Sequence, residues 1–296
     1  MCITKTQTFF MKPKVDFCFK ELMEDETVRK AFIAAVIGIK FDEIQEALLL
    51  PTHLRKSIKE DKLGILDVRV LLNSNIQIDI EIQIASTEYW AERTMFYLGK
   101  MFTEQIKEGD DYSELKKCIH IGILDFELFN SEEFYSRFHL WEDSRHQIYS
   151  DKWEFHTLEL PKLAKHDYPQ TELFKWMQFI NAETKEELDM ASADNPYIKK
   201  ACENLERISA DEEKRLEYEA REKAIRDHNH FMRMSKQAGW NEGLEKGLEK
   251  GLEQGLEILV TTCRDLGLTP EDTITRITEK SSLSLEKARE FVEKYW

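Results

Sequence analysis

Two pairs of charged residues are spaced so that their side chains could act together in catalysis. Asp67 and Arg69 lie two residues apart, and Asp79 and Glu81 repeat that spacing within the same stretch, residues 62–84. Residues two apart in a β-strand point to the same face of the sheet. The four side chains therefore share one face if both segments are strands that pair with each other.

The sequence around these residues predicts that pairing. Two runs rich in Ile, Leu and Val flank Asn-Ser-Asn at 73–75, which indicates two short antiparallel strands joined by a three-residue loop. If Leu72 pairs with Ile76, Arg69 lies opposite Asp79, and the acidic residue at 67 lies opposite the one at 81. Opposed side chains are about 4.5–5.5 Å apart at Cβ, and like charges at that distance are destabilising.

Two arrangements would relieve the repulsion between these carboxylates. A hard divalent cation such as Mg²⁺ takes one or two protein carboxylates and shares its other positions with water and substrate phosphate. Alternatively, Arg69 neutralises Asp79 and Glu81 in a solvated, salt-bridged sheet face of the kind that half-exposed strands carry. The spacing alone leaves both interpretations open.

The segment ILDVRVLLNSNIQIDIEIQ resembles the core of the PD-(D/E)XK nucleases. Further segments, VDFCFKELM at 15–23, EIQ at 81–83, AERTMFYLGKMFTEQIKEGDDYSELKKCIHIGILDF at 91–126 and a glycine-punctuated tail, resemble the recombination-promoting nuclease/transposase (Rpn) family of that superfamily. The resemblance runs from about residue 13 to the end. It implies a restriction-endonuclease-like α/β fold, in which helices flank a mixed central sheet, followed by an all-helical C-terminal region.

The resemblance also implies roles for three residues of the hairpin. Asp67 and Glu81 would hold the metal, Mg²⁺ or Mn²⁺. Gln83 takes the position that usually holds a lysine, which departs from the wider superfamily although EIQ fits this family. Gln83 would then orient the attacking water.

Residues 16–38 predict two helices packed on the sheet, the second ending at Gly38. By the resemblance, Asp16 or Glu21 supplies the acidic residue that the superfamily often carries on its first helix, and Lys20 approaches phosphate. The alternative is that all three are exposed positions beside a packed Phe stripe.

Two arginines are candidates for substrate binding. Residues 87–107 predict a helix in which Tyr89, Arg93 and Tyr97 recur on one face. Arg93 emerges close to Gln83 and could contact a phosphate with two hydrogen bonds, whereas the aromatic residues alone are typical of a core. Arg69 is the second candidate.

The rest of the chain predicts strands and then helices. A polar loop over 51–61 precedes the hairpin, and the apolar run 118–126 fits a buried strand parallel to the one before it. His120 in that run is interpreted as a satisfied core residue. Residues 135–142 and 153–160 predict another pair of strands. From Thr171 on, the pattern is helical, with Pro196 opening one helix and with a long charged helix over 211–236.

The C-terminal part contains a period-four repeat, Gly-Leu-Glu-Lys, which begins at Gly243. Each glycine inside a helix costs roughly 1 kcal/mol relative to alanine, so the repeat predicts a marginal helix. Its glycine stripe indicates either self-association or a low-complexity spacer. Thr269 and Ser284 predict the starts of two short helices, interpreted as a small stabilising pair rather than a DNA-binding helix-turn-helix.

These patterns divide the chain into four regions: a nuclease-like domain over 13–165, a helical region over 166–238, the repeat over 239–258 and a small helical pair over 259–296. The first ten residues match nothing recognisable, so Met11 is an alternative start.

Composition limits the choice of function. The formal net charge is −15, so any affinity for DNA should be weak and salt-sensitive. No apolar run approaches the roughly 18 residues of a membrane span, and the five scattered cysteines suit a cytoplasmic protein with reduced thiols. We expect a divalent-metal-dependent DNA endonuclease that promotes recombination, with DNA as partner, no membrane association, and homo-oligomerisation through the C-terminal helices. The alternative is a catalytically inactive nuclease fold that acts as a protein-interaction or oligomerisation module.

Overall fold

The computed structural model describes residues 9–54, 64–281 and 283–296. The contacts divide the chain into two compact units, residues 1–226 and 227–296. The polar loop predicted over 51–61 lies largely outside the described residues.

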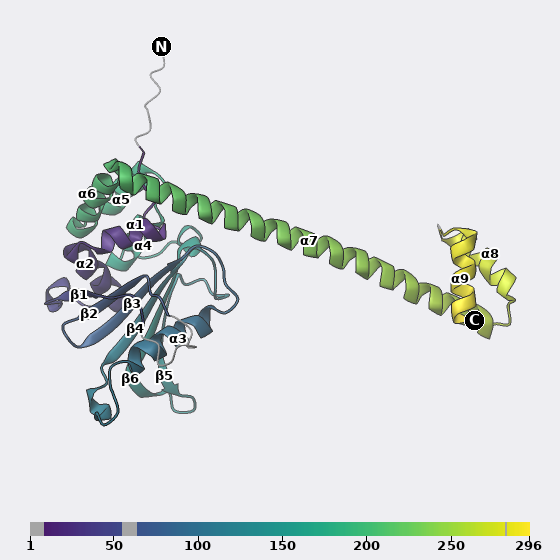
Figure 1. The fold of residues 1–296 in the computed structure, drawn as a ribbon, viewed down its shortest axis with the longest axis horizontal. Helices are drawn as coiled ribbons and strands as arrows, with labels where there is room; N and C mark the ends of the chain where they lie inside the picture. The colour runs from purple at the N-terminus through teal and green to yellow at the C-terminus, as the bar shows by residue number, and fades with distance from the viewer. Residues whose placement is uncertain (1–8, 55–63, 282) are drawn as a thin grey trace, which may run out of the picture. The chain divides into compact units, whose positions relative to one another are not determined.

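The first unit is built on a mixed sheet, seen at the centre of its ribbon in Figure 1. In the described residues the sheet has six strands in the order β1-β2-β3-β4-β6-β5. The β2–β3 and β5–β6 pairs are antiparallel, and β3–β4 and β4–β6 are parallel. The strands are β1 (Ala47–Leu50), β2 (Val68–Leu72), β3 (Ile76–Gln83), β4 (Lys117–Leu124), β5 (Tyr135–Glu142) and β6 (Gln147–Glu159). This arrangement confirms the predicted mixed sheet.

The predicted hairpin forms with the predicted register. Leu72 pairs with Ile76, and Arg69 pairs with Asp79. The loop can turn this tightly because Asn73 and Ser74 adopt the left-handed conformation, with φ of 48° and 53°. The strand pairing ends at Val68 and Ile80, so the acidic residue at 67 lies just before β2 and is not a strand partner of the one at 81.

Helices cover both faces of the sheet. On the apolar face, which includes Ile78 and Ile80, the core is completed by α1 (Asp16–Met23), α2 (Glu26–Ile37), α4 (Glu172–Asn181) and α6 (Pro196–Ala210). The other face is covered by α3 (Trp90–Thr103), whose Leu98 and Met101 form a second cluster with Cys118. Figure 1 shows α3 on the opposite side of the sheet from α1, α2 and α4. All of β4 after its first residue is buried, as predicted for a strand covered on both faces.

The remaining elements of this unit are short, apart from the start of α7. They are η1 (Phe41–Glu43), η2 (Tyr112–Glu114), η3 (Leu160–Ala164) and α5 (Lys185–Ser192). Residues of α4, α5 and α6 belong to the same apolar cluster as α1 and α2, so the helical region after 166 completes the core of the sheet domain. The domain boundaries expected at 165, 238 and 258 stay predictions.

The C-terminal elements are α7 (Glu212–Asp265), α8 (Pro270–Lys280) and α9 (Leu285–Tyr295). The glycine repeat lies inside α7 and is helical. Both predicted helix starts are confirmed: Thr269 accepts a hydrogen bond from the amide of Asp272, and Ser284 accepts one from the amide of Lys287. The apolar contacts of this unit join the end of α7 to α8 and α9 through Leu256, Val260, Ile277, Ala288 and Val292.

None of the helices in the described ranges is both long enough and apolar enough to cross a membrane.

Candidate active site

Asp67 lies at the entrance to β2, where its carboxylate is held from two sides. Its Oδ2 accepts a hydrogen bond of 3.3 Å from the backbone N–H of Ile82 in β3. Its Oδ1 lies 2.9 Å from the ammonium of Lys20. The hydrogen bond from β3 therefore fixes one oxygen of Asp67, and the ion pair with Lys20 engages the other.

Glu81 projects from the middle of β3 and is almost fully buried, with 1% of its surface exposed. Neither carboxylate oxygen has a hydrogen-bond partner among the residues that the structure describes. Its nearest cation is Arg93 in the first turn of α3, whose Nε lies 3.4 Å from Oε2. Burial, and after it the charge on Asp79, raises the pKa of Glu81 to about 7.

Arg93 is held at the edge of this site by an aromatic ring. Its guanidinium lies over the ring of Tyr97, 5.3 Å from the centroid, and 40% of its side chain is exposed. Of the two tyrosines expected on the same helix face as Arg93, Tyr97 is the one that the guanidinium contacts.

The first helix contributes one residue to the site. Lys20 reaches Asp67, as described above, whereas Glu21 points elsewhere and pairs with Lys214 at the start of α7. Asp16 is the half-buried first residue of α1. Of these three residues, Lys20 is the one that the structure pairs with a hairpin carboxylate, and the acidic roles of Asp16 and Glu21 stay predictions.

Gln83 and Arg69 are both engaged within the protein. Gln83 ends β3, and its Nε2 donates a 2.9 Å hydrogen bond to the carbonyl of Ala85. Arg69 is buried and donates a 2.8 Å hydrogen bond to Gln77, with Glu104 3.4 Å away. Their roles in catalysis and substrate binding stay predictions.

Sequence reasoning missed a buried acid–imidazole pair beside Glu81. The Nδ1 of His120 lies 2.8 Å from Oδ2 of Asp79, and both residues are buried. Burial, and after it the charge on Asp67, raises the pKa of Asp79 well above its usual range, and burial lowers the pKa of His120 to about 4. Burial therefore disfavours the charged form of each residue. Only the parallel register of β3 and β4, which pairs residue 79 with residue 120, brings the two together.

The carboxylates fit a hard divalent cation. Within the described part of the chain, no group of three or more His, Cys, Asp or Glu side chains is arranged to hold a metal by itself. Mg²⁺, however, is commonly bound through one or two carboxylates, with water and substrate phosphate completing its coordination. Glu81 offers two buried oxygens without hydrogen-bond partners in the described residues, and Asp67 is hydrogen-bonded to the N–H of Ile82, the residue that follows Glu81.

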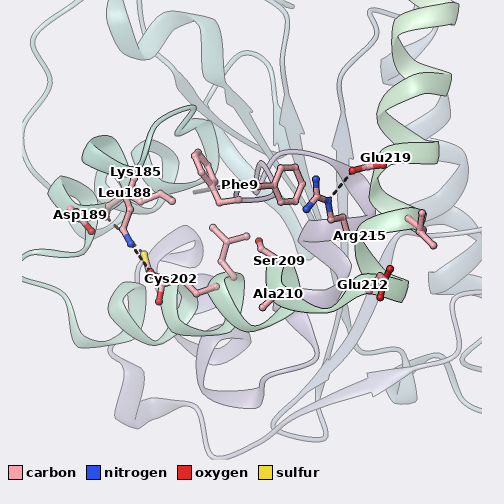
Figure 2. A pocket seen from close by; sticks show the side chains of 14 residues that line it. Phe9, Lys185, Leu188, Asp189, Cys202, Ser209, Ala210, Glu212, Arg215 and Glu219 are labelled. Carbon is pink, nitrogen blue, oxygen red and sulfur yellow. Dashed lines mark hydrogen bonds and ion pairs between the residues drawn. The ribbon is translucent and has the colours of Figure 1, made fainter. Parts of the chain in front are cut away.

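One pocket lies away from these residues, between Phe9, α5, α6 and the start of α7. Its volume is about 930 Å³. Figure 2 shows its lining, with Arg215 over the ring of Phe9 and bonded to Glu219. Lys185 on its rim is likewise paired, with Glu206. Of the described residues that line it, none is a predicted site residue, and we assign it no chemistry.

Comparison with known proteins identifies the class to which this fold and site belong. Residues 13–235 match the family described as PD-(D/E)XK nuclease family transposase. Because the match covers most of the chain, the protein belongs to that family, which confirms the resemblance and supports a nuclease-like function. No curated protein and no solved structure gives a significant match.

Proposed function

We propose that the protein is a divalent-metal-dependent DNA endonuclease that hydrolyses phosphodiester bonds and promotes DNA recombination. The observation that carries the proposal is the buried carboxylate of Glu81, whose oxygens have no hydrogen-bond partners among the described residues. Asp67 is held close by through its hydrogen bond to Ile82, the next residue of β3. Family membership supports the same class of reaction.

Asp67 and Glu81 would hold the metal, Mg²⁺ or Mn²⁺. A divalent cation bound there would supply positive charge to the attacked phosphate and would acidify a water molecule. The N–H of Ile82 holds the Asp67 carboxylate in place, and the strand position of Glu81 holds the second carboxylate. Rigid placement of this kind is what preorganises a site for a developing charge.

Gln83 and the basic side chains would act on the water and the phosphate. The hydrogen bond from Gln83 to Ala85 fixes the amide plane, and Oε1 would accept a hydrogen bond from the attacking water. Arg93, stacked on Tyr97 and partly exposed, can donate two hydrogen bonds to phosphate oxygens. We also propose Lys20 as a phosphate contact, because it already lies at Asp67.

The test is nicking of supercoiled plasmid at low salt with Mg²⁺ or Mn²⁺. Asp67→Asn and Glu81→Gln keep side-chain shape but remove the charge, and each should lower the rate by about 100-fold or more. Glu108→Gln, which changes an exposed carboxylate in the same unit, should cut like the wild type. Equal cutting by all four proteins would show that the proposed site is not used.

A second candidate function is a protein-interaction module built on an inactive nuclease fold. It is favoured by exposed apolar side chains along α7, including Phe231, Met232, Trp240 and Leu248. Absence of metal-dependent nicking in the wild type, together with self-association in solution, would support this function instead.

A further inference from the structure

Each carboxylate of the proposed metal site is paired with a basic side chain from a different helix. Lys20 of α1 lies 2.9 Å from Asp67, and Arg93 of α3 lies 3.4 Å from Glu81. Two acids that are separated by 14 residues on one hairpin are thus neutralised by two cations from opposite faces of the sheet.

The two cations are more exposed to solvent than the two acids. The side chains of Lys20 and Arg93 are 39% and 40% exposed, but those of Asp67 and Glu81 are only 23% and 2% exposed. Long Lys and Arg side chains on a surface helix can turn into solvent without disturbing the core. The carboxylates, in contrast, are tied to β3: Asp67 accepts the hydrogen bond from Ile82, and Glu81 is a buried residue of the strand itself.

The contact between Arg93 and Glu81 is also loose. The ion pair measures 3.4 Å from Nε of Arg93 to Oε2 of Glu81, longer than an ordinary charged hydrogen bond, and neither Glu81 oxygen has a hydrogen-bond partner of good geometry among the described residues. A guanidinium that made a permanent structural pair would use its planar donors on the carboxylate.

Permanent pairs elsewhere in the protein look different. Lys162 is fully buried and donates to Glu159, to the carbonyl of Glu133 and to the hydroxyl of Ser131. A pair of this kind cannot exchange a partner without leaving buried charge unpaired. For Lys20 and Arg93 this penalty is smaller, because about two-fifths of each side chain is exposed.

We infer that Lys20 and Arg93 are exchangeable counter-cations of the metal site. In the metal-free protein they neutralise Asp67 and Glu81. When a divalent cation binds the two carboxylates, its two positive charges replace those of Lys20 and Arg93. The released ammonium and guanidinium groups then bind the phosphate of the DNA. This inference rests on the proposed function and adds to it the order of events: metal binding frees the residues that bind substrate.

The inference predicts that removing Lys20 or Arg93 changes metal affinity and DNA affinity in opposite directions. Removing either cation removes a competitor for the carboxylates, so Mn²⁺ should bind more tightly. The same change removes a phosphate contact, so DNA binding and cleavage should weaken. A merely structural ion pair would weaken both, because its loss would leave the carboxylate poorly placed.

The experiment measures Mn²⁺ affinity of the full chain without DNA, by electron paramagnetic resonance at pH 8.5, and plasmid nicking in parallel. Lys20→Met and Arg93→Met should each bind Mn²⁺ at least about threefold more tightly and cut at least about tenfold more slowly. Lys20→Arg and Arg93→Lys keep the charge and should bind Mn²⁺ like the wild type. Lys165→Met breaks a half-exposed ion pair with Glu127 elsewhere and should change neither value.

The outcomes separate the two proposals. If the wild type binds Mn²⁺ and cuts, both in a manner that depends on Asp67 and Glu81, the proposed function stands. Unchanged or weaker Mn²⁺ binding by both methionine variants would then overturn the exchange alone. A wild type that neither binds Mn²⁺ nor cuts would overturn both.

Discussion

At the scale of single residues, two buried glutamates have opposite environments. Burial alone would raise the pKa of Glu154, but the hydrogen bond from Arg137 and the close polar contacts of His156 and Lys117 outweigh it and hold the pKa well below its usual range. Glu81 is buried to the same extent but has no hydrogen-bond donor among the described residues, so its pKa is raised. The first is paired within the fold, whereas the second is the carboxylate that we propose as a metal ligand.

The environment of Glu154 predicts a pH-dependent stability. A carboxylate with a lowered pKa in the folded state stabilises the protein above its unfolded-state pKa, near 4 to 5, and loses that contribution as the pH falls further. Glu154→Gln should therefore be markedly less stable than wild type at pH 7, and the difference should shrink between about pH 5 and pH 3. Urea unfolding followed by tryptophan fluorescence measures this difference. Glu108→Gln serves as the exposed control, and a difference that stays constant with pH would contradict the assignment.

At the scale of elements, the parallel pairing of β3 with β4 makes room for a helix at the site. Gly122 lies opposite Glu81 in that register. A Cβ at Gly122 would lie 2.6 Å from Cζ2 of Trp90 and 3.2 Å from Nε2 of His120. The missing side chain is what lets the indole of Trp90, at the start of α3, pack against the strand beside the acid–imidazole pair.

Gly122→Ala should therefore destabilise the protein, by about 1–3 kcal/mol, because the buried indole must move. Gly99→Ala is the matched control in α3, where the new Cβ would meet its nearest atom at 3.6 Å, an ordinary contact. Because alanine favours a helix, that change should stabilise by about 0.5–1 kcal/mol. Thermal and urea unfolding measure both changes, and equal effects of the two substitutions would argue against close packing of Trp90 on β4.

At the scale of the whole molecule, the C-terminal unit has its own small core and a helix weakened by glycine. A Cβ at Gly247 or Gly251 would meet no atom of the described residues within 4 Å. Nothing in those contacts requires glycine, so the double substitution Gly247→Ala, Gly251→Ala should stabilise α7 by about 1 kcal/mol per site. Circular dichroism during heating measures the gain, and plasmid nicking should be unchanged.

The same variant distinguishes the two interpretations of the glycine repeat. If the glycine stripe lets another copy of the helix come close, the added methyl groups should weaken self-association, which analytical ultracentrifugation would detect. If the repeat is a low-complexity spacer, the sedimentation of wild type and variant should be identical.

The sequence by itself determined the features that depend on neighbours along the chain. Turn chemistry, apolar periodicity and helix capping act over only a few residues. They were therefore enough to predict the hairpin register, the buried β4, the helix start at Pro196 and the N-caps at Thr269 and Ser284. The order of such segments was also enough to indicate the nuclease family, which the comparison confirmed.

Only the tertiary structure decided which side chains meet across elements. The packing of helices on the two faces of the sheet decides the ion pairs of the hairpin acids, Lys20 with Asp67 and Arg93 with Glu81. The register of two strands that α3 separates decides the contact of His120 with Asp79. No local pattern encodes that packing, because a shift of one residue in a strand would send each side chain to the other face. The carboxylates could therefore be proposed from the sequence, whereas the partners that hold them could not.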